Sequence, residues 1–124
     1  MSGDTGAIAK DYCLHYYYLL QSNPQALSTL YSDSSLLSFE GDAFEGVAGI
    51  VQKLQSLPAA TYDLANIESQ PSVNGGVCIF VEGYMLVNQQ LLHFFSSFLI
   101  MPDASGGNFR VLNQFFRISY QSGR

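Results

Sequence analysis

Apolar side chains in the first half of the chain recur at the spacing of α-helices. Over residues 5–22 they fall three or four positions apart, which predicts a helix with one apolar side. Asn23 and Pro24 end this helix and can start a short second one, because asparagine is a good cap and proline fits the first turn. The apolar positions of the second helix are Ala26, Leu27, Leu30 and Tyr31, and those of a third helix, which Pro58 ends, are Val47, Ile50, Val51, Leu54 and Leu57.

After residue 60 the pattern changes to apolar runs separated by polar turns. Asn74-Gly75 is a strong hairpin signal, since both residues readily adopt the positive φ angles of a tight turn. With further polar breaks at 88–90 and 103–108, the turns delimit strands at 62–71, 76–87, 91–102 and 108–120, which short connections arrange as an antiparallel meander. A short strand at 36–39 precedes the third helix. The fold class is therefore α+β, with one domain over residues 1–124.

The predicted sheet is apolar on both of its faces. In the strand at 76–87 only Glu82 is charged, and Gly83 predicts a bend or bulge. Three helices can cover one face of a bent sheet, but the other face needs a partner, and a sheet-to-sheet dimer is the simplest interpretation. Sequence leaves open which alternate residues face the helices. The residues predicted at the dimer interface are Phe80, Tyr84, Phe94 and Phe98.

Charge and cysteine content narrow the class of function. Charged residues make up 12% of the chain, the net charge is −5 and five residues are basic, which argues against nucleic acid or an anionic membrane as a partner. Cys13 and Cys78 lie in apolar stretches and are predicted to be buried free thiols. No clustered cysteine and histidine predicts a metal site, and no cofactor is expected. Without a signal-peptide pattern or an apolar run of about 20 residues, an intracellular soluble protein is expected.

Catalytic patterns are weak throughout the sequence. His15 and His93 are each interpreted as packed or hydrogen-bonded histidines, and no nucleophile motif or glycine-rich phosphate loop is present. Carboxylates such as Asp63, Glu68 and Glu82 show no spacing that indicates a shared site. Glu40 differs, because it follows Phe39 at the end of a predicted strand and beside Gly41. It can stand at the rim of a cavity between sheet and helices, or be a solvated loop charge.

The chain resembles the nuclear transport factor 2 family along nearly its whole length. Each motif alone is weak, and their order and spacing together carry the resemblance. The matching segments are His15-Tyr16-Tyr17, Leu30-Tyr31, Leu37-Ser38-Phe39-Glu40-Gly41, Gly46, Ile50-Val51, Lys53-Leu54, Ser56-Leu57-Pro58, Gln70-Pro71, Gly83, Asn113 and Phe116-Arg117. The resemblance implies a cone-shaped fold, in which three helices lie inside a strongly bent antiparallel sheet that dimerises through its other face.

The resemblance also implies a non-enzymatic carrier of the cytoplasm, the nucleus and the nuclear pore. Such a carrier binds the GDP-bound form of the GTPase Ran, brings it into the nucleus, and passes the pore by weak contacts with Phe-x-Phe-Gly repeats of nucleoporins. By position, Phe39 and Glu40 match the family's aromatic–glutamate pair, with Glu40 as the acceptor of a salt bridge from Ran. The positions that match the family's cavity lining are Leu57, Leu86, Phe115 and Phe116.

Three departures from the family pattern bear on the ligand. The segment Asn88-Gln89-Gln90 lacks the acidic residues that relatives commonly carry there, and Asn113-Gln114 replaces an Asn-Asp pair. An N-terminal aromatic residue that some members use for repeat binding is absent, and Thr5 lies near its position. Two further functions therefore stay open. One is a scaffold that pairs with an mRNA-export receptor or binds short peptides through the same sheet, which the neutral 88–90 segment favours. The other is an enzyme that uses the hollow.

Overall fold

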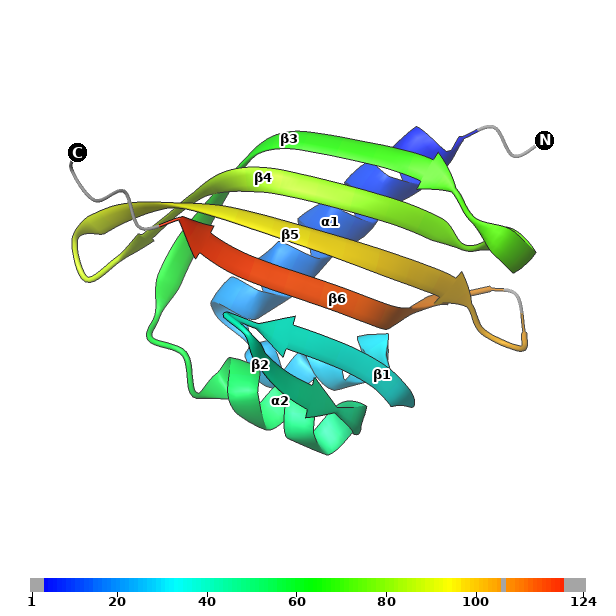
Figure 1. Ribbon diagram of the computed structural model, residues 1–124, viewed down its shortest axis with the longest axis horizontal. Coiled ribbons are helices and arrows are strands. Elements are labelled where there is room, and N and C mark those ends of the chain that lie inside the picture. The colour runs from blue at the N-terminus through cyan, green and yellow to red at the C-terminus, as the bar shows by residue number, and fades with distance from the viewer. Residues whose placement is uncertain (1–3, 106, 120–124) are drawn as a thin grey trace.

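The computed structural model describes residues 4–105 and 107–119 (Figure 1). Its helical elements are α1 (Thr5–Ser22), the 3₁₀ helix η1 (Pro24–Leu30), α2 (Gly46–Gln55) and the 3₁₀ turn η2 (Val73–Gly75). Its strands are β1 (Tyr31–Phe39), β2 (Asp42–Glu45), β3 (Ala60–Pro71), β4 (Val77–Val87), β5 (Gln90–Pro102) and β6 (Phe109–Ser119). The predicted strand at 108–120 thus matches β6, except that residue 120 lies outside the described residues.

The helices follow the predicted order, with differences at their ends. The first helix has the predicted bounds, but the second is a 3₁₀ helix that stops at Leu30, and Tyr31 already belongs to β1. The third helix ends at Gln55, before Leu57. Its end has a local cause, because the residue before a proline is disfavoured in helical conformation and Pro58 follows Leu57.

Within the described residues the strands form one sheet in the order β2-β1-β6-β5-β4-β3. The meander from β3 to β6 is confirmed, but the expectation of a wholly antiparallel sheet is wrong, since β1 runs parallel to β6. The predicted 36–39 strand is the last part of a longer one, and β2 was not predicted. Glu40 and Gly41 connect β1 to β2 in a tight turn, with φ angles of 51° and 91°.

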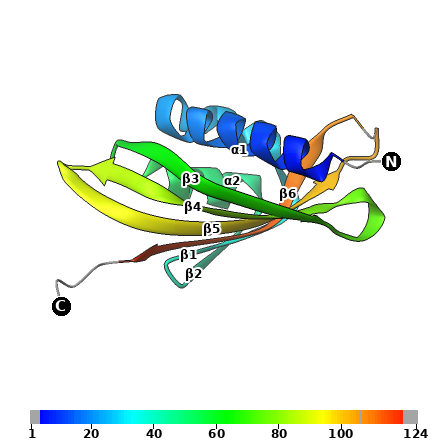
Figure 2. The same cartoon turned by 90° about the horizontal axis from the view of Figure 1, so that it is seen from above.

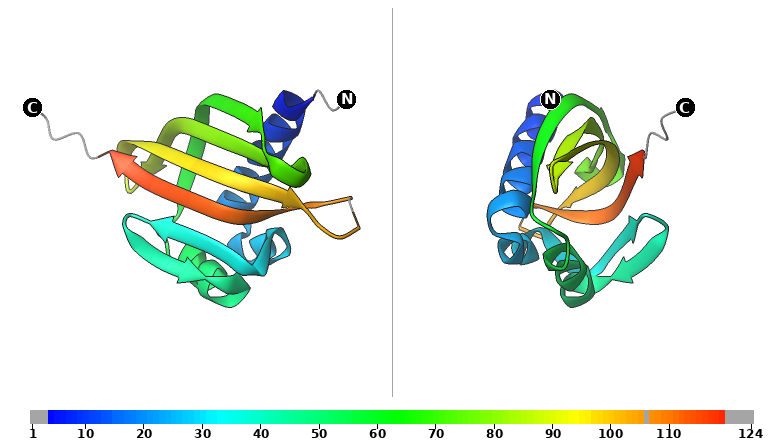
Figure 3. Two further views of the ribbon diagram at one scale, coloured as in Figure 1. Left: turned by 45° about the vertical axis from the view of Figure 1, so that its right-hand side comes forward. Right: turned by 90° about the vertical axis from the view of Figure 1, so that its left-hand side faces the viewer.

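The helices lie on one side of the sheet, whose strands bow around α1 (Figures 2 and 3). α1 packs on β3 and β4, and α2 packs on β1 and η1. We call the sheet face toward the helices the inner face and the opposite one the outer face. The buried inner-face residues of the three long central strands are Val77, Ile79, Val81, Met85, Val87, Phe94, Ser96, Phe98, Ile100, Val111, Gln114 and Phe116.

The assignment of residues to the inner and outer faces corrects half of the predicted dimer interface. Phe94 and Phe98 are 0% and 3% exposed and pack against the aromatic side chain of Tyr17 on α1, so they belong to the core. Phe80 and Tyr84 lie on the outer face and are 41% and 40% exposed. Side chains alternate between the two faces along a strand. The sequence did not reveal that Phe80 and Tyr84 point to one face while Phe94 and Phe98 point to the other.

The predicted irregularity at Gly83 is confirmed. Gly83 pairs with Leu64 and the preceding residue of β4, Glu82, pairs with Asn66, so Ala65 is an extra residue in β3. A side chain at Gly83 would meet backbone, since a Cβ there would lie 2.3 Å from the carbonyl oxygen of Asp63. The bulge and the close approach of β3 therefore require glycine at this position.

Candidate binding site

A column of aromatic rings lies in the interior of the protein, next to the β1–β2 turn. The Phe39 and Phe116 rings are stacked at 4.8 Å with an interplanar angle of 3°, and Phe116 stacks on Phe94 at 5.4 Å and 9°. Tyr62 of β3 meets Phe94 edge-on at 5.7 Å. At the other end, the Lys53 ammonium of α2 lies 5.0 Å from the centre of the Phe39 ring. We call Phe39, Phe116, Phe94 and Tyr62 the aromatic column. Lys53 covers the Phe39 end of this column by a cation–π contact.

Leu57 lies at the opposite end of this column. Together with Leu20, Leu54 and Tyr62 it lines a hollow of about 200 Å³ between the ends of the two α-helices and the start of β3. Phe39 and Phe116 are 7% and 3% exposed, so they fill the interior instead of lining an open cavity. The structure therefore brings Phe39 and Phe116 into direct contact, and connects them to the Leu57 hollow through Phe94 and Tyr62.

Leu86 and Phe115 do not line this interior. They lie on the outer face and are 47% and 56% exposed. Each sits between two buried neighbours, Leu86 between Met85 and Val87 and Phe115 between Gln114 and Phe116. Since neighbours along a strand point to opposite faces, neither side chain can share a cavity with Phe116. Their predicted place in the cavity lining is wrong.

Glu40 is a structural part of the β1–β2 turn. Its backbone N–H donates to the carbonyl oxygen of Phe116 at 3.0 Å. Its carboxylate Oε2 accepts a hydrogen bond from the backbone N–H of Ile118, the residue after Arg117 on β6. The half-buried carboxylate therefore ties the β1–β2 turn to β6 beside the aromatic column. A carboxylate has acceptor capacity beyond one bond, so the same group can also meet a ligand.

Gln114 belongs to a closed ring of buried hydrogen bonds. The Tyr31 hydroxyl donates to Gln114 Oε1 at 2.5 Å, Gln114 Nε2 donates to the Tyr16 hydroxyl at 2.9 Å, and the two hydroxyls lie 2.8 Å apart. Burial raises the pKa of Tyr16 to about 12. The ring needs an amide, because a carboxylate cannot donate to Tyr16. Gln114 thus forms hydrogen bonds with two core tyrosines and does not lie at the rim of a cavity. The sequence alone did not reveal this role.

The turn between β4 and β5 consists of Asn88 and Gln89, with φ angles of 53° and 66°. Both angles are positive, as in a tight turn of the kind that joins twisted antiparallel strands. The predicted polar break is confirmed, although Gln90 already belongs to β5. The turn offers amides and no charge to a ligand.

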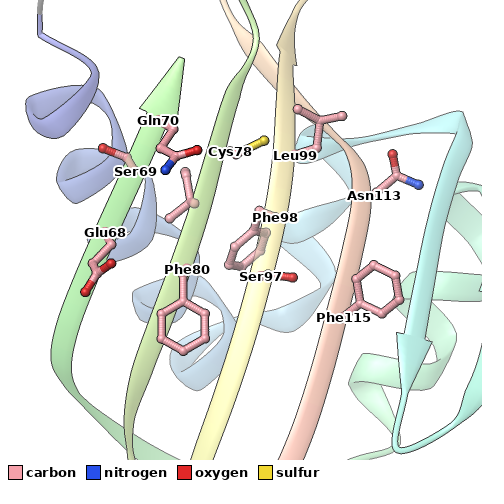
Figure 4. Close-up of a pocket in the computed structure, with 11 residues that line it drawn as sticks. Glu68, Ser69, Gln70, Cys78, Phe80, Ser97, Phe98, Leu99, Asn113 and Phe115 are labelled. Carbon is pink, nitrogen blue, oxygen red and sulfur yellow. The ribbon is translucent and has the colours of Figure 1, made fainter. Parts of the chain in front are cut away.

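The outer face has a hollow of its own (Figure 4). It has a volume of about 360 Å³, and its lining includes Glu68, Cys78, Phe80, Leu99 and Phe115. Cys78 is exposed, which corrects the prediction of a buried thiol, while Cys13 is buried as predicted. Phe80, Tyr84, Leu86 and Phe115 make this exposed face apolar.

Two features are absent from the described part of the chain. Over residues 4–105 and 107–119, no three or more histidine, cysteine, aspartate or glutamate side chains group closely enough to hold an ion. None of the helices in these ranges combines the length and the hydropathy that spanning a bilayer requires. His15 is exposed on α1 and lines a separate hollow with Tyr12 and Arg110.

Comparisons with known proteins agree with this architecture. A model of the nuclear transport factor 2 (NTF2) domain matches residues 8–118. Nuclear transport factor 2 from Oryza sativa subsp. japonica is 41% identical over 122 residues, which cover 94% of this chain and 98% of the relative. The protein of the same name from Emericella nidulans is 37% identical over 124 residues, covering 96% and 98%. Among solved structures, nuclear transport factor 2 from Cryptosporidium parvum superposes with a TM-score of 0.88 at 35% identity, covering 94% of this chain and 96% of that chain.

Proposed function

We propose that this chain, which belongs to the nuclear transport factor 2 family, carries GDP-bound Ran into the nucleus. The family is one of non-enzymatic transport factors, so the enzymatic alternative is discarded. The observation that supports the proposal most is the match over nearly the whole length, at 41% identity, to a protein named for nuclear transport. The range that the family model matches, residues 8–118, spans Phe39 of the aromatic column and Glu40 next to it. Like the carriers it resembles, the protein is proposed to move between cytoplasm and nucleus through Phe-x-Phe-Gly repeats at the pore.

Glu40 and the aromatic column supply complementary parts of a Ran site. The column offers an apolar interior with a hollow at the Leu57 end, where an aromatic side chain of Ran can insert. Glu40 offers a half-buried carboxylate on the β1–β2 turn, at the Phe39 end of the column, for a basic residue of Ran. Since the Asn88–Gln89 turn is uncharged and Gln114 is buried, Glu40 carries a larger share of the charge pairing here than in relatives with acidic residues at these positions.

The structure selects the substitution that tests Glu40. Glu40→Lys would remove the charge but also the acceptor for the Ile118 N–H, so a loss of binding could come from a disturbed turn. Glu40→Gln keeps an acceptor oxygen and removes only the charge. We expect Glu40→Gln to weaken Ran-GDP binding by about tenfold or more, as for a lost charge-assisted hydrogen bond. Titration calorimetry with Ran loaded with GDP measures the change.

The matched control is Asp11→Asn, which changes the net charge equally on the exposed surface of α1. Its affinity for Ran-GDP should equal that of the unmodified protein. Equal affinities for all three proteins would rule out Glu40 as the anchor of the charge pairing. If the unmodified chain retains neither Ran-GDP nor Ran-GTP in a pull-down, the scaffold function, which the neutral Asn88–Gln89 turn favours, replaces the carrier.

The outer face is proposed to join two copies of the chain. Its exposed aromatic and aliphatic side chains form an apolar surface that α1 and α2 leave uncovered, since both helices lie on the inner side (Figures 2 and 3). A second copy presents the same apolar composition, and pairing of two such faces gives a closed two-fold assembly. Phe80 and Tyr84 remain the proposed interface residues, and Phe94 and Phe98 do not.

Phe80→Arg is expected to shift the protein toward monomer. The arginine would place a charge on the outer face without disturbing the core, because Phe80 is 41% exposed in the single chain. Sedimentation velocity at micromolar concentration measures the change, and the far-ultraviolet circular dichroism spectrum should stay the same. An unmodified protein that sediments as a monomer under these conditions would contradict the proposed dimer.

A further inference from the structure

The outer face contains a polar cluster among its apolar side chains. His93 Nε2 on β5 lies 2.7 Å from Glu82 Oε2 on β4, and Asn66 Nδ2 on β3 donates to Glu82 Oε1 at 2.9 Å. We call these three side chains the polar cluster. The Glu82 and His93 side chains are 27% and 26% exposed, so water still reaches both of them in the single chain.

Aromatic rings hold the histidine in place. Tyr84 stacks on the His93 ring at 4.9 Å and 19°, and Phe95 contacts it at 4.5 Å. Phe80 in turn lies 6.3 Å from Phe95. The polar cluster is therefore bordered by side chains of the proposed interface, and a partner that covers Phe80 and Tyr84 must also cover Glu82 and His93.

Other ionisable groups on the neighbouring strands lie around this cluster. On β3, Asp63 is opposite Tyr84 and Glu68 is opposite Phe80. On β6, Arg117 is opposite Phe95. On β4, the exposed thiol of Cys78 lies beyond Phe80. Hydrogen bonds from Asn66 and His93 hold the pKa of Glu82 below its usual value, so this carboxylate is ionised at neutral pH.

The charge of the Glu82–His93 pair depends on one proton. With glutamate ionised and histidine neutral, the pair carries −1, and with one proton more it is neutral overall. The extra proton can reside on the imidazole or on the carboxylate, and the pair is neutral in either case. Removing the pair from water disfavours the state with net charge, and two copies would bring two such charges into one interface.

We propose that the outer face pairs with a second copy of this chain in a proton-coupled association, in which each copy's polar cluster takes up a proton as the interface closes. This inference rests on the proposed dimer and adds the chemistry that controls it. Because the associated state binds more protons, association strengthens as the pH falls and weakens as it rises. The association constant is therefore expected to fall between pH 6 and pH 8.

The direct test is the dimer dissociation constant of the full chain at pH 6, 7 and 8, from sedimentation equilibrium. We expect the constant to rise by about tenfold or more from pH 6 to pH 8. His93→Gln should remove this dependence. Glu82→Gln should reverse it, since a histidine without a carboxylate is buried more easily when neutral. The control is His15→Gln, whose histidine is exposed on α1 and which should behave like the unmodified protein.

The outcomes of this test distinguish the proposed dimer from the proposed proton coupling. A protein that is monomeric at every pH overturns the proposed dimer. A dimer whose dissociation constant does not change between pH 6 and 8 overturns the proton coupling and leaves the dimer standing. Loss of the pH dependence in His15→Gln, or its retention in His93→Gln, also contradicts the assignment to the polar cluster. Thermal unfolding of each variant at pH 7 verifies that the fold is intact.

Discussion

Phe94→Ala is expected to lower the free energy of unfolding by about 3–5 kcal/mol, the usual cost of removing a buried phenylalanine ring. Phe94 is 0% exposed, and its ring contacts those of Tyr17, Tyr62 and Phe116. Truncation leaves a cavity between α1 and the sheet that these neighbours cannot close. Urea denaturation at a fixed protein concentration measures the loss, since a dimer would make apparent stability depend on concentration.

A matched control for Phe94→Ala is Tyr18→Ala. Tyr18 is also aromatic, but it is 67% exposed on α1, and its truncation should change the free energy of unfolding by about 0.5 kcal/mol or less. A loss below about 1 kcal/mol for Phe94→Ala would contradict the core position of this ring. A normally stable but monomeric Phe94→Ala variant would instead support the interface position that the structure rejects.

Gly83→Ala is expected to cost about 2–3 kcal/mol, as overpacking against rigid backbone does. The new Cβ would lie 2.3 Å from the Asp63 carbonyl oxygen, and β3 would have to move away from β4 at the bulge. Thermal and urea denaturation measure the effect. Because the obstacle is backbone and not the end of a flexible side chain, little local relaxation is available.

Gly49→Ala provides a control of opposite sign. Gly49 lies within α2, and a Cβ there meets nothing within 4 Å. Alanine should therefore stabilise the helix by about 0.5–1 kcal/mol, because glycine has the larger conformational entropy to lose. Equal effects of the two substitutions would show that the close approach at Gly83 does not constrain the sheet.

The elements that depend on local sequence signals were predicted well. The bounds of α1 and the β3 to β6 meander follow from helical spacing, hairpin residues and polar breaks. The parallel pairing of β1 with β6 has no such signal, because it joins segments about 80 residues apart and depends on how the sheet closes. The inner and outer faces were likewise undetermined, since both sets of alternate residues in β4 and β5 are apolar.

The candidate site was predicted in part. The sequence placed Phe39 and Glu40 beside each other, and the resemblance added Phe116, which stacks on Phe39. Leu86 and Phe115 were misplaced because a position match carries no information about which way a strand side chain points. Gln114 looked like a lost surface charge, whereas it bonds two buried tyrosines that helical periodicity marked only as apolar.

The parallel pairing of β1 and β6 constrains when the fold can be completed during synthesis. β1 and β2 occupy one edge of the sheet, and their connection to the rest of it runs through β6, the last strand in the described chain. During synthesis β1 and β2 therefore leave the ribosome long before β6, the strand that pairs with β1, has been made. Contacts of such long sequence separation form late and slowly. Until then the apolar side of β1, including Leu37 and Phe39, has only η1 and α2 to cover it, so part of this apolar surface stays exposed until β6 is synthesised.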